Sequence, residues 1–309
     1  MNKSFKDFPK DFLSIADFNL EQINQVLTLA SKLKKERPKH KQVLKDKIIG
    51  VFTTKPSLRT RISFEIAILE LGGKTLFIKD DEIGLGSRES YSDVSQVLSR
   101  YFNAFIIRSN DHKGLLELAS ISKISIINAL TDEEHPCQIL ADLLTLQEIF
   151  GELKGLKLSY IGDANNVSNS LMLASVIIGI EFKIICPDEF KPQEKYIKKA
   201  KNLAKEYNSP QIQISNNPNE CIDADVLYTD TWISMGQKVE KNHKEKFSKY
   251  QLNSDLLKNK NIPVLHCLPA HKGEEISIEL FEKNSNNIFN QAENRLHAQK
   301  ALLEILLGE

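Results

Sequence analysis

The sequence predicts an α/β protein of two domains, each a mainly parallel sheet flanked by helices. Short runs rich in apolar and β-branched residues alternate with helical patterns along almost the whole chain, which is typical of parallel strands with helices on both faces. The 309 residues are too many for one ordinary core and suit two domains of about 150 residues each. No repeat of fixed period and no low-complexity tract interrupts this alternation.

The predicted strands are short apolar runs, and helical segments supply the long connections that parallel strands need. In the first half of the chain the strands lie at Lys47–Thr54, Lys74–Ile78, Ala104–Arg108 and Ile124–Ala129. In the second half they lie at Lys157–Gly162, Phe182–Cys186, Gln211–Ile214, Val226–Thr229 and Pro263–Cys267. Helices are predicted at Ser57–Leu71, Ser90–Tyr101, Pro136–Phe150, Val167–Ile178 and Glu194–Tyr207.

The boundary between the two halves is expected at the helix Pro136–Phe150, which Gly151 ends. The last segment, Glu293–Leu307, carries apolar residues on one side, which predicts a helix with a buried face. We expect this C-terminal helix to pack back on the first domain. The expected divisions are residues 1–148, residues 149–290 and, for the returning helix, residues 291–309.

Composition and charge exclude several classes of protein. Lysine plus arginine (41) equal aspartate plus glutamate (41), so no global field favours nucleic acid or an anionic membrane. The N-terminus lacks an apolar signal core, and the longest apolar stretch, Leu171–Ile180, is too short to span a bilayer. The four cysteines (Cys137, Cys186, Cys221 and Cys267) form no CxxC pair, which argues against a zinc knuckle or a disulfide framework. A cytoplasmic protein with reduced thiols is expected.

Polar residues gather where predicted strands end, which is where ligands bind in open α/β sheets. After the first predicted strand comes Ser57-Leu58-Arg59-Thr60-Arg61. Ser57 is a good helix N-cap. The N–H groups of the first turn, together with an arginine and two hydroxyls, suit a phosphate group. The alternative is a capped surface helix with solvated arginines.

Two further strands end in candidate ligand-binding residues. Arg108 ends the third predicted strand and places a cation there, although a surface ion pair is the plainer interpretation. After the fourth strand, Pro136 suits the first helical position, so His135 becomes the cap and Gln138 lies one turn in. Alone, such a histidine is usually packed or solvated. The acidic run Asp132–Glu134 before it predicts a solvated loop.

In the second half, the segment Gly162-Asp163-Ala164-Asn165-Asn166 resembles a dinucleotide-binding turn. Only one glycine of the GxGxxG pattern is present, which disfavours binding of NAD. The two asparagines indicate hydrogen bonds to a carboxylate or an amine of a ligand. The alternative is an Asx turn that caps the following helix.

Two more loops follow strands in the second half. The segment Asp230–Gly236 combines an acid, the only tryptophan (Trp232), a hydroxyl and a glycine, as in a closing loop or in a capped turn with a packed tryptophan. Cys267 ends the last predicted strand, as a reactive thiol or as a small buried hydrophobe. His266 and His271 straddle a proline loop and lack the i,i+4 geometry of a helical metal pair, so we expect no metal site.

Taken together, these segments resemble the aspartate/ornithine carbamoyltransferase superfamily over essentially the full chain, and most closely its ornithine carbamoyltransferases. Ser57–Arg61 and His135–Gln138 resemble the carbamoyl phosphate motifs of the superfamily. Asp230–Gly236 and His266–Pro269 resemble the ornithine-specific motifs. The resemblance implies transfer of the carbamoyl group from carbamoyl phosphate to the δ-amino group of L-ornithine, giving L-citrulline and phosphate, without a cofactor. It also implies a homotrimer or a multiple of trimers, acting in arginine biosynthesis or breakdown.

The resemblance further implies roles for individual residues. Arg59, His135 and Cys267 would act in catalysis, and a cis bond would join Leu268 to Pro269. Carbamoyl phosphate would be bound by Ser57, Leu58, Arg59, Thr60, Gly84, Arg108, His135, Gln138, Cys267, Leu268 and Arg295. Ornithine would be bound by Asn166, Asp230, Ser234 and Met235.

Two positions depart from the family pattern. Leu58 stands where threonine is usual, so one hydroxyl is absent although the backbone N–H remains. Gly84 stands where many relatives carry glutamine, in a loop that the family's trimer sends into a neighbouring subunit's site. One contact across subunits is therefore in question.

Rival functions differ in the residues they require. Aspartate carbamoyltransferases have a lysine in the flexible loop and His-Pro-Leu-Pro in place of His266–Pro269, and neither pattern is present. Putrescine carbamoyltransferases do not need an α-amino partner such as Asp230. A catalytically silent carbamoyl phosphate-binding regulator is the alternative from a different class, and turnover separates it from an enzyme.

Overall fold

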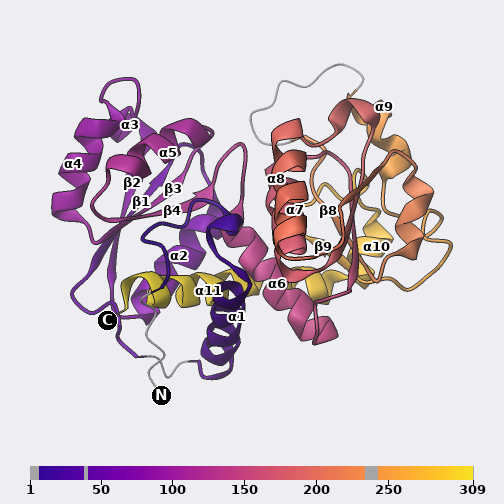
Figure 1. Cartoon of the computed structure of the whole chain (residues 1–309), viewed down its shortest axis with the longest axis horizontal. Coiled ribbons are helices and arrows are strands. Elements are labelled where there is room, and N and C mark those ends of the chain that lie inside the picture. The colour runs from indigo at the N-terminus through magenta and orange to yellow at the C-terminus, as the bar shows by residue number, and fades with distance from the viewer. Residues whose placement is uncertain (1–6, 38–40, 234–242, 309) are drawn as a thin grey trace. The chain divides into compact units, whose positions relative to one another are not determined.

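The computed structural model describes residues 7–37, 41–233 and 243–308, which form two compact units (Figure 1). The first unit comprises Met1–Leu144 with Asn294–Glu309, and the second comprises Thr145–Glu293. Each unit contains one parallel sheet flanked by helices, which confirms the predicted fold class. Helix α11 (Ser285–Leu307) ends within the first unit, as expected of the C-terminal helix. Within the described ranges, every helix is too short or too polar to cross a membrane.

The sheet of the first unit has the strand order β2-β1-β3-β4. Its strands are β1 (Ile48–Thr53), β2 (Lys74–Lys79), β3 (Ala104–Arg108) and β4 (Ser125–Leu130). Its helices are α1 (Leu20–Lys35), α2 (Leu58–Glu70), α3 (Asp80–Ile83), α4 (Tyr91–Tyr101), α5 (His112–Ile121) and α6 (Pro136–Phe150), which ends beyond the unit boundary. Right-handed crossovers place α2 on one face of the sheet and α4 and α5 on the other (Figure 1).

The sheet of the second unit has the strand order β7-β6-β5-β8-β9, again with parallel pairing. Its strands are β5 (Lys157–Ile161), β6 (Glu181–Ile185), β7 (Gln213–Ser215), β8 (Val226–Thr229) and β9 (Val264–His266). Its helices are α7 (Asn166–Ile178), α8 (Glu194–Glu206), α9 (His243–Phe247) and α10 (Ile278–Lys283). The described residues also form short 3-10 helices, namely η1 (Ile15–Asp17), η2 (Asp188–Phe190), η3 (Pro218–Asp223) and η4 (Ser248–Tyr250).

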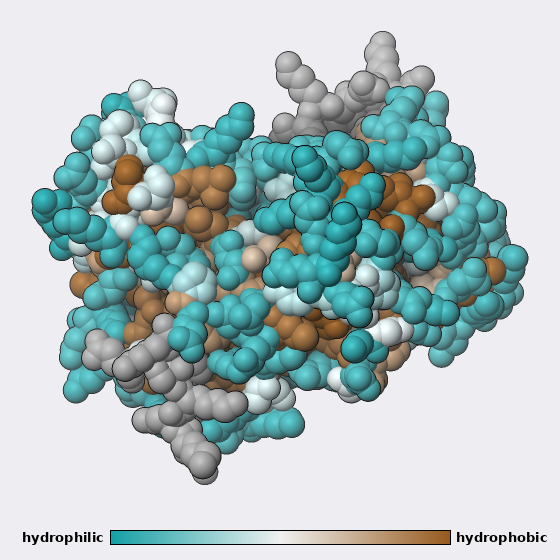
Figure 2. All heavy atoms as spheres, viewed as in Figure 1, coloured by the Kyte–Doolittle hydropathy of each residue, from teal (hydrophilic) through white to brown (hydrophobic). Residues whose placement is uncertain are grey.

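Apolar side chains explain where the helices pack. In the first unit, α4 and α5 cover one sheet face through a buried cluster that includes Phe105, Leu98 and Leu115. In the second unit, all residues from Val167 to Ile178 of α7 are buried. Helix α8 instead buries one side and presents its lysines to solvent, as the hydrophilic band over it shows (Figure 2).

The structure adds elements that the sequence pattern did not predict. Helices α1, α5 and α10 were not among the helices named from the sequence pattern. Helix α1 nonetheless has a helical apolar period, since Ile23, Val26, Leu27, Ala30 and Leu33 are buried, whereas α10 spans only Ile278–Lys283. The predicted strand Gln211–Ile214 is shifted, because β7 pairs with β6 only over Gln213–Ser215. The remaining predicted strands match observed ones to within a few residues at each end.

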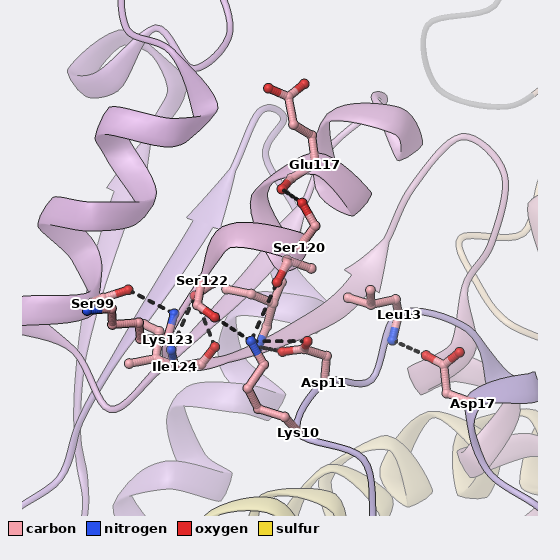
Figure 3. Close-up of polar contacts among 12 residues, drawn as sticks. Lys10, Asp11, Leu13, Asp17, Ser99, Glu117, Ser120, Ser122, Lys123 and Ile124 are labelled. Atoms are coloured by element: carbon pink, nitrogen blue, oxygen red, sulfur yellow. Dashed lines mark hydrogen bonds and ion pairs between the residues drawn. The ribbon is translucent and has the colours of Figure 1, made fainter.

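An N-terminal segment extends the first sheet beyond β4. Phe12 bridges Ile127 in parallel, its N–H donates to the carbonyl of Ile126 (2.9 Å) and its carbonyl accepts from Asn128 (2.8 Å). Asp11 Oδ1 accepts from the N–H of Ile126 at 2.8 Å, and Lys10 donates to the carbonyl of Ser122 (Figure 3). These bonds cover an edge strand that would otherwise expose unpaired backbone groups.

Asp11→Asn is expected to keep the free energy of unfolding near that of the wild type at pH 7, whereas Asp11→Ala is expected to lower it by about 1–3 kcal/mol. Asparagine can still accept from Ile126, but alanine leaves that N–H without its acceptor. Urea titrations of both variants and the wild type check this expectation. Equal losses in both variants would show that the charge, not the acceptor, matters.

Those titrations also have an expected pH dependence. Burial raises the pKa of Asp11 above its ordinary value of 3.8, so the folded state binds the proton more tightly than the unfolded chain. The contribution of protonated Asp11 to the free energy of unfolding is therefore complete below pH 3.8 and is lost as the pH rises through the raised pKa. The Asp11→Asn variant should lack this loss.

Candidate functional site

Both sheets reverse their strand order at one point, and some of the predicted site residues, among them Ser57, Arg108 and Asp230, follow the strands beside these points. In the first unit the reversal lies between β1 and β3, and in the second between β5 and β8. The connections that follow the two strands of such a pair go to opposite faces of the sheet. This leaves a crevice at the carboxyl ends of the two strands. The fold therefore provides one candidate ligand site in each unit.

In the first unit, the Thr60 hydroxyl contacts a nearby serine and two arginines from distant parts of the sequence. Thr60 is fully buried in the first turn of α2. Its Oγ1 lies 3.2 Å from Arg108 Nη1 at the end of β3, 3.2 Å from Arg295 Nη2 of α11 and 3.0 Å from Ser57 Oγ. One hydroxyl thus fixes two guanidinium groups beside a helix N-terminus.

Ser57 is the N-cap residue of α2, as predicted, but its side chain does not cap the helix. Its hydroxyl donates to Thr60 instead. The N–H groups of the first turn of a helix lack intrahelical acceptors, so at α2 they are available to an external anion. The neighbouring guanidinium groups strengthen the preference of this helix end for an anion.

His135 lies close to the same charges. It is buried, and its carbonyl accepts from Gln138 (3.0 Å) at the start of α6. Burial, followed by the charges of Arg295, Arg108 and Arg59, lowers the pKa of His135 well below its ordinary value of 6.5. The imidazole is therefore neutral, and it can donate one hydrogen bond without adding to the positive charge.

Gln138 offers a buried acceptor next to this group. Its Nε2 donates to Asp142 Oδ1 at 2.8 Å, which fixes the orientation of the amide. Its Oε1 is buried and has no hydrogen-bond partner among the described residues. A buried acceptor of this kind costs free energy unless a ligand satisfies it, so Gln138 is suited to a ligand N–H group.

One prediction about this region is wrong. The acidic run before His135 was expected in a solvated loop, but Glu134 is buried and its Oε2 accepts from Ser14 Oγ at 2.9 Å. The N-terminal segment that extends the sheet supplies this serine. Sequence patterns could not reveal it, because the two residues are 120 positions apart.

In the second unit, Asp230 follows β8 and accepts two hydrogen bonds. Asn165 Nδ2 donates to its Oδ2 at 2.7 Å, and Cys267 Sγ donates to its Oδ1 at 3.0 Å. Asn165 is also the N-cap of α7, where its Oδ1 accepts from the N–H groups of Val167 and Ser168. The Asx cap and the polar contact to a site residue therefore coexist in one side chain.

The prediction named Asn166, which lies half-buried in the first turn of α7. Its neighbour Asn165, which contacts Asp230, was indicated only as one of two asparagines and was not assigned to the ornithine site. The Asn-Asn pair indicated a polar group at this turn, but the choice between its members depends on side-chain direction. The alternative in which Trp232 packs is supported, since Trp232 is buried and stacks on Phe247.

Cys267 follows β9 and is buried, with its thiol directed at Asp230. The next residue, Leu268, has a positive φ of 58°, and the Leu268–Pro269 bond is cis, which confirms the expectation drawn from the resemblance. Among the residues that the structure describes, Asp230, His266 and Cys267 form a group with metal-ligand atoms within 4.8 Å of one another. Both nitrogens of His266 already take part in hydrogen bonds, so this histidine is poorly suited to ligate a metal.

The other predicted residues lie as follows. The side chain of Leu58 is 71% exposed, so only its backbone faces the helix mouth. Gly84 ends α3 in a left-handed conformation that favours glycine (φ 63°). Ser234 and Met235 lie outside the residues that the structure describes.

Two family models match this chain, one over each half. The family model described as "Aspartate/ornithine carbamoyltransferase, carbamoyl-P binding domain" matches residues 10–148, and the "Asp/Orn binding domain" model matches residues 154–306. The catabolic ornithine carbamoyltransferase of Thermoplasma volcanium is 44% identical over 97% of this chain and 99% of its own. The ornithine carbamoyltransferase of Aquifex aeolicus is 43% identical over 97% and 98% of the two chains.

Solved structures give the same similarity. The ornithine carbamoyltransferase of Pyrococcus furiosus has a TM-score of 0.91 at 40% identity and covers 96% of each chain. The anabolic ornithine carbamoyltransferase of Campylobacter jejuni has a TM-score of 0.90 at 37% identity and covers 96% of this chain and 99% of its own.

The imidazole of His135 is expected to stay neutral in the folded protein down to well below pH 6.5, because burial and three guanidinium groups oppose its protonation. The unfolded chain takes up this proton near pH 6.5, so the stabilisation is present above pH 6.5 and is lost as the pH falls towards the lowered pKa. Side-chain ¹⁵N chemical shifts followed with pH measure the protonation directly. His135→Gln should reduce the acid loss of stability, and a midpoint near 6.5 in the folded protein would contradict the assignment.

Proposed function

The chain belongs to the aspartate/ornithine carbamoyltransferase family, and from this premise we propose that it transfers the carbamoyl group of carbamoyl phosphate to the δ-amino group of L-ornithine. The products are L-citrulline and phosphate. The observation that carries the proposal is the arrangement around Thr60, where a helix N-terminus and two guanidinium groups meet beside a neutral histidine. That arrangement suits an acyl phosphate, which presents a phosphate group and a carbonyl oxygen together.

In the first unit, we assign carbamoyl phosphate to the mouth of α2. Ser57, Leu58, Arg59 and Thr60 would hold the phosphate through the first helical turn, with Arg108 beside them. His135 and Arg295 would contact the carbamoyl group. The unsatisfied Oε1 of Gln138 would accept from the carbamoyl NH₂. That NH₂ is a hydrogen-bond donor, whereas the phosphate oxygens are acceptors.

In the second unit, we assign the amino acid to the loops after β5, β8 and β9. Asp230 would pair with the α-amino group, since each carboxylate oxygen keeps acceptor capacity beyond its one observed bond. Asn166, Ser234 and Met235 complete the proposed ornithine site. Cys267 would lie beside the reacting δ-amino group, and the backbone at Cys267 and Leu268 would contact the carbamoyl group.

The reaction is acyl transfer, in which the neutral δ-amine attacks the carbamoyl carbon and phosphate leaves. Negative charge develops on the carbonyl oxygen and remains on the leaving phosphate. Arg59, Thr60 and the neutral His135 would donate to the carbonyl oxygen, while Arg108 and the N-terminus of α2 stabilise the phosphate. These donors are fixed before the substrate arrives, so little reorganisation is needed during the reaction.

We further propose that the protein is a cytoplasmic homotrimer acting in arginine metabolism. Apolar side chains are exposed on α2 and on the edge strand β2, at Leu58, Ile62, Leu69 and Leu76, which supports a subunit interface there. Relatives described as catabolic and as anabolic are both similar to this chain. Biosynthesis of arginine and its breakdown therefore both fit the proposed reaction.

Acceptor preference tests the proposed reaction. Phosphate release and product formation should be measured with ornithine, aspartate and putrescine at equal concentrations of carbamoyl phosphate. Ornithine is expected to exceed the others in kcat/KM by about 10²-fold or more, because putrescine lacks the α-amino group that Asp230 would bind and aspartate lacks a δ-amino group. Preference for aspartate or putrescine would reassign the substrate, and no turnover with any acceptor would favour a silent regulator.

Arg59→Ala is expected to lower kcat by about 10²- to 10³-fold, the usual cost of losing one fixed donor to a developing oxyanion. Arg61→Ala is the matched control from the same helical turn. The Arg61 guanidinium lies 4.7 Å from the Phe77 ring centroid and pairs with Glu65, so its loss should change kcat by less than about threefold. Melting temperatures report folding, and near-normal citrulline formation by Arg59→Ala would refute the role of Arg59.

A further inference from the structure

Next to Cys267 lies a buried histidine–carboxylate pair to which the proposed reaction assigns no role. His266 ends β9, and Glu275 lies nine residues later. Both side chains are fully buried, and His266 Nε2 lies 3.0 Å from Glu275 Oε1. Buried pairs of this kind are costly to desolvate, so the pair needs an explanation beyond the stability of the unit.

The hydrogen bonds of His266 determine its tautomer. The backbone N–H of Leu268 donates to His266 Nδ1 at 2.9 Å. A backbone N–H can only donate, so Nδ1 is the unprotonated nitrogen. The ring proton is then on Nε2, which donates to Glu275.

Glu275 contacts both ends of the loop formed by residues 266–271. Its Oε1 accepts from the backbone N–H of His271 at 2.6 Å as well as from His266. One carboxylate oxygen therefore ties the first and last residues of the segment 266–271 together. The backbone of His266 is fixed in turn, because its N–H donates to Gln291 Oε1 at 2.9 Å and Gln291 donates to Tyr228 Oη at 3.1 Å.

The backbone of Leu268 depends on these hydrogen bonds. Its φ of 58° is left-handed, a conformation that is unfavourable for a non-glycine residue. The bond from its N–H to His266 Nδ1 stabilises the backbone at this residue. The direction of the peptide groups at Cys267 and Leu268 thus depends on an imidazole acceptor at one position.

We propose that His266 and Glu275 are positioning residues, which act by holding the backbone of Cys267 and Leu268 in the conformation that contacts the reactants. This inference rests on the proposed carbamoyl transfer. His266 Nδ1 sets the peptide at Leu268, and Glu275 sets the ring of His266 and closes the loop at His271. Neither side chain touches a substrate.

Two substitutions of His266 separate its two bonds. In His266→Asn, the amide Oδ1 takes the place of Nδ1 and still accepts from Leu268, but the donor to Glu275 is lost. In His266→Gln, the amide Nε2 takes the place of the ring Nε2 and still donates to Glu275, but the acceptor for Leu268 is lost. Each variant loses one buried hydrogen bond, so the two form a matched pair for stability.

His266→Gln is expected to lower kcat for citrulline formation by about 10- to 100-fold, because small misplacement of a contacting group has costs of this size. His266→Asn is expected to lower kcat clearly less than His266→Gln does, because Leu268 keeps its acceptor although Glu275 no longer holds the side chain. KM for carbamoyl phosphate should change by less than about threefold in both, since the phosphate contacts lie on α2. Similar losses of kcat in both variants, or a greater loss in His266→Asn, would overturn the proposal.

A second measurement does not depend on turnover. Side-chain ¹⁵N shifts of His266 in the wild-type protein should show a neutral ring protonated on Nε2, and the opposite tautomer would overturn the proposal. If the wild type makes no citrulline, the proposed function fails, whereas the tautomer still tests the hydrogen-bond arrangement. Melting temperatures of the two variants show whether a loss of kcat reflects unfolding, and activity lost only in proportion to folded protein would also overturn it.

Discussion

Positive charge held at the N-terminus of α2 is the constraint on which the first site depends. Arg108 and Arg295 both donate to the buried hydroxyl of Thr60, and two unit charges a few Å apart repel by a few kcal/mol even at an effective dielectric constant of about 20. The fold tolerates this repulsion because one arginine is fixed at the end of β3 and the other on α11. A bound dianion relieves the repulsion, so charge that opposes folding favours substrate binding. Burial, followed by the charges of Arg295, Arg108 and Arg59, lowers the pKa of His135 and keeps it neutral.

In the second unit the buried charged group is a carboxylate, that of Asp230. Asp230 is buried, and its two carboxylate oxygens accept from Asn165 and from the thiol of Cys267, as a buried polar group requires. Burial, followed by the charge of Asp230, raises the pKa of Tyr160 well above its ordinary value of 10.0. Tyr160 therefore stays protonated and donates to the carbonyl of Asp163 at 2.9 Å. The carboxylate that we propose to bind an ammonium group is thus surrounded by neutral donors.

Local patterns predicted much of this molecule, and long-range contacts account for what they missed. Ser57 as the first residue before α2, Pro136 at the start of α6 and the strand before Arg108 follow from short-range rules on caps and apolar runs. The meeting of Arg295 with Thr60 joins residues 235 positions apart, and only the family resemblance indicated it. Asn165 and Glu275 were missed for the same reason, since their roles depend on which way a side chain turns in the folded loop.

The contacts also indicate which positions of the first site tolerate change. Where the backbone donates, as at the start of α2, the side chain is free to vary, and Leu58 in place of the usual threonine is 71% exposed. Where a side chain joins several elements, as Thr60 does, a substitution would displace two arginines at once. His266 belongs to the second kind although it lies outside the proposed substrate contacts, because the peptide at Leu268 depends on its Nδ1. Tolerance therefore follows the number of elements that a side chain joins, and not its distance from the reacting atoms.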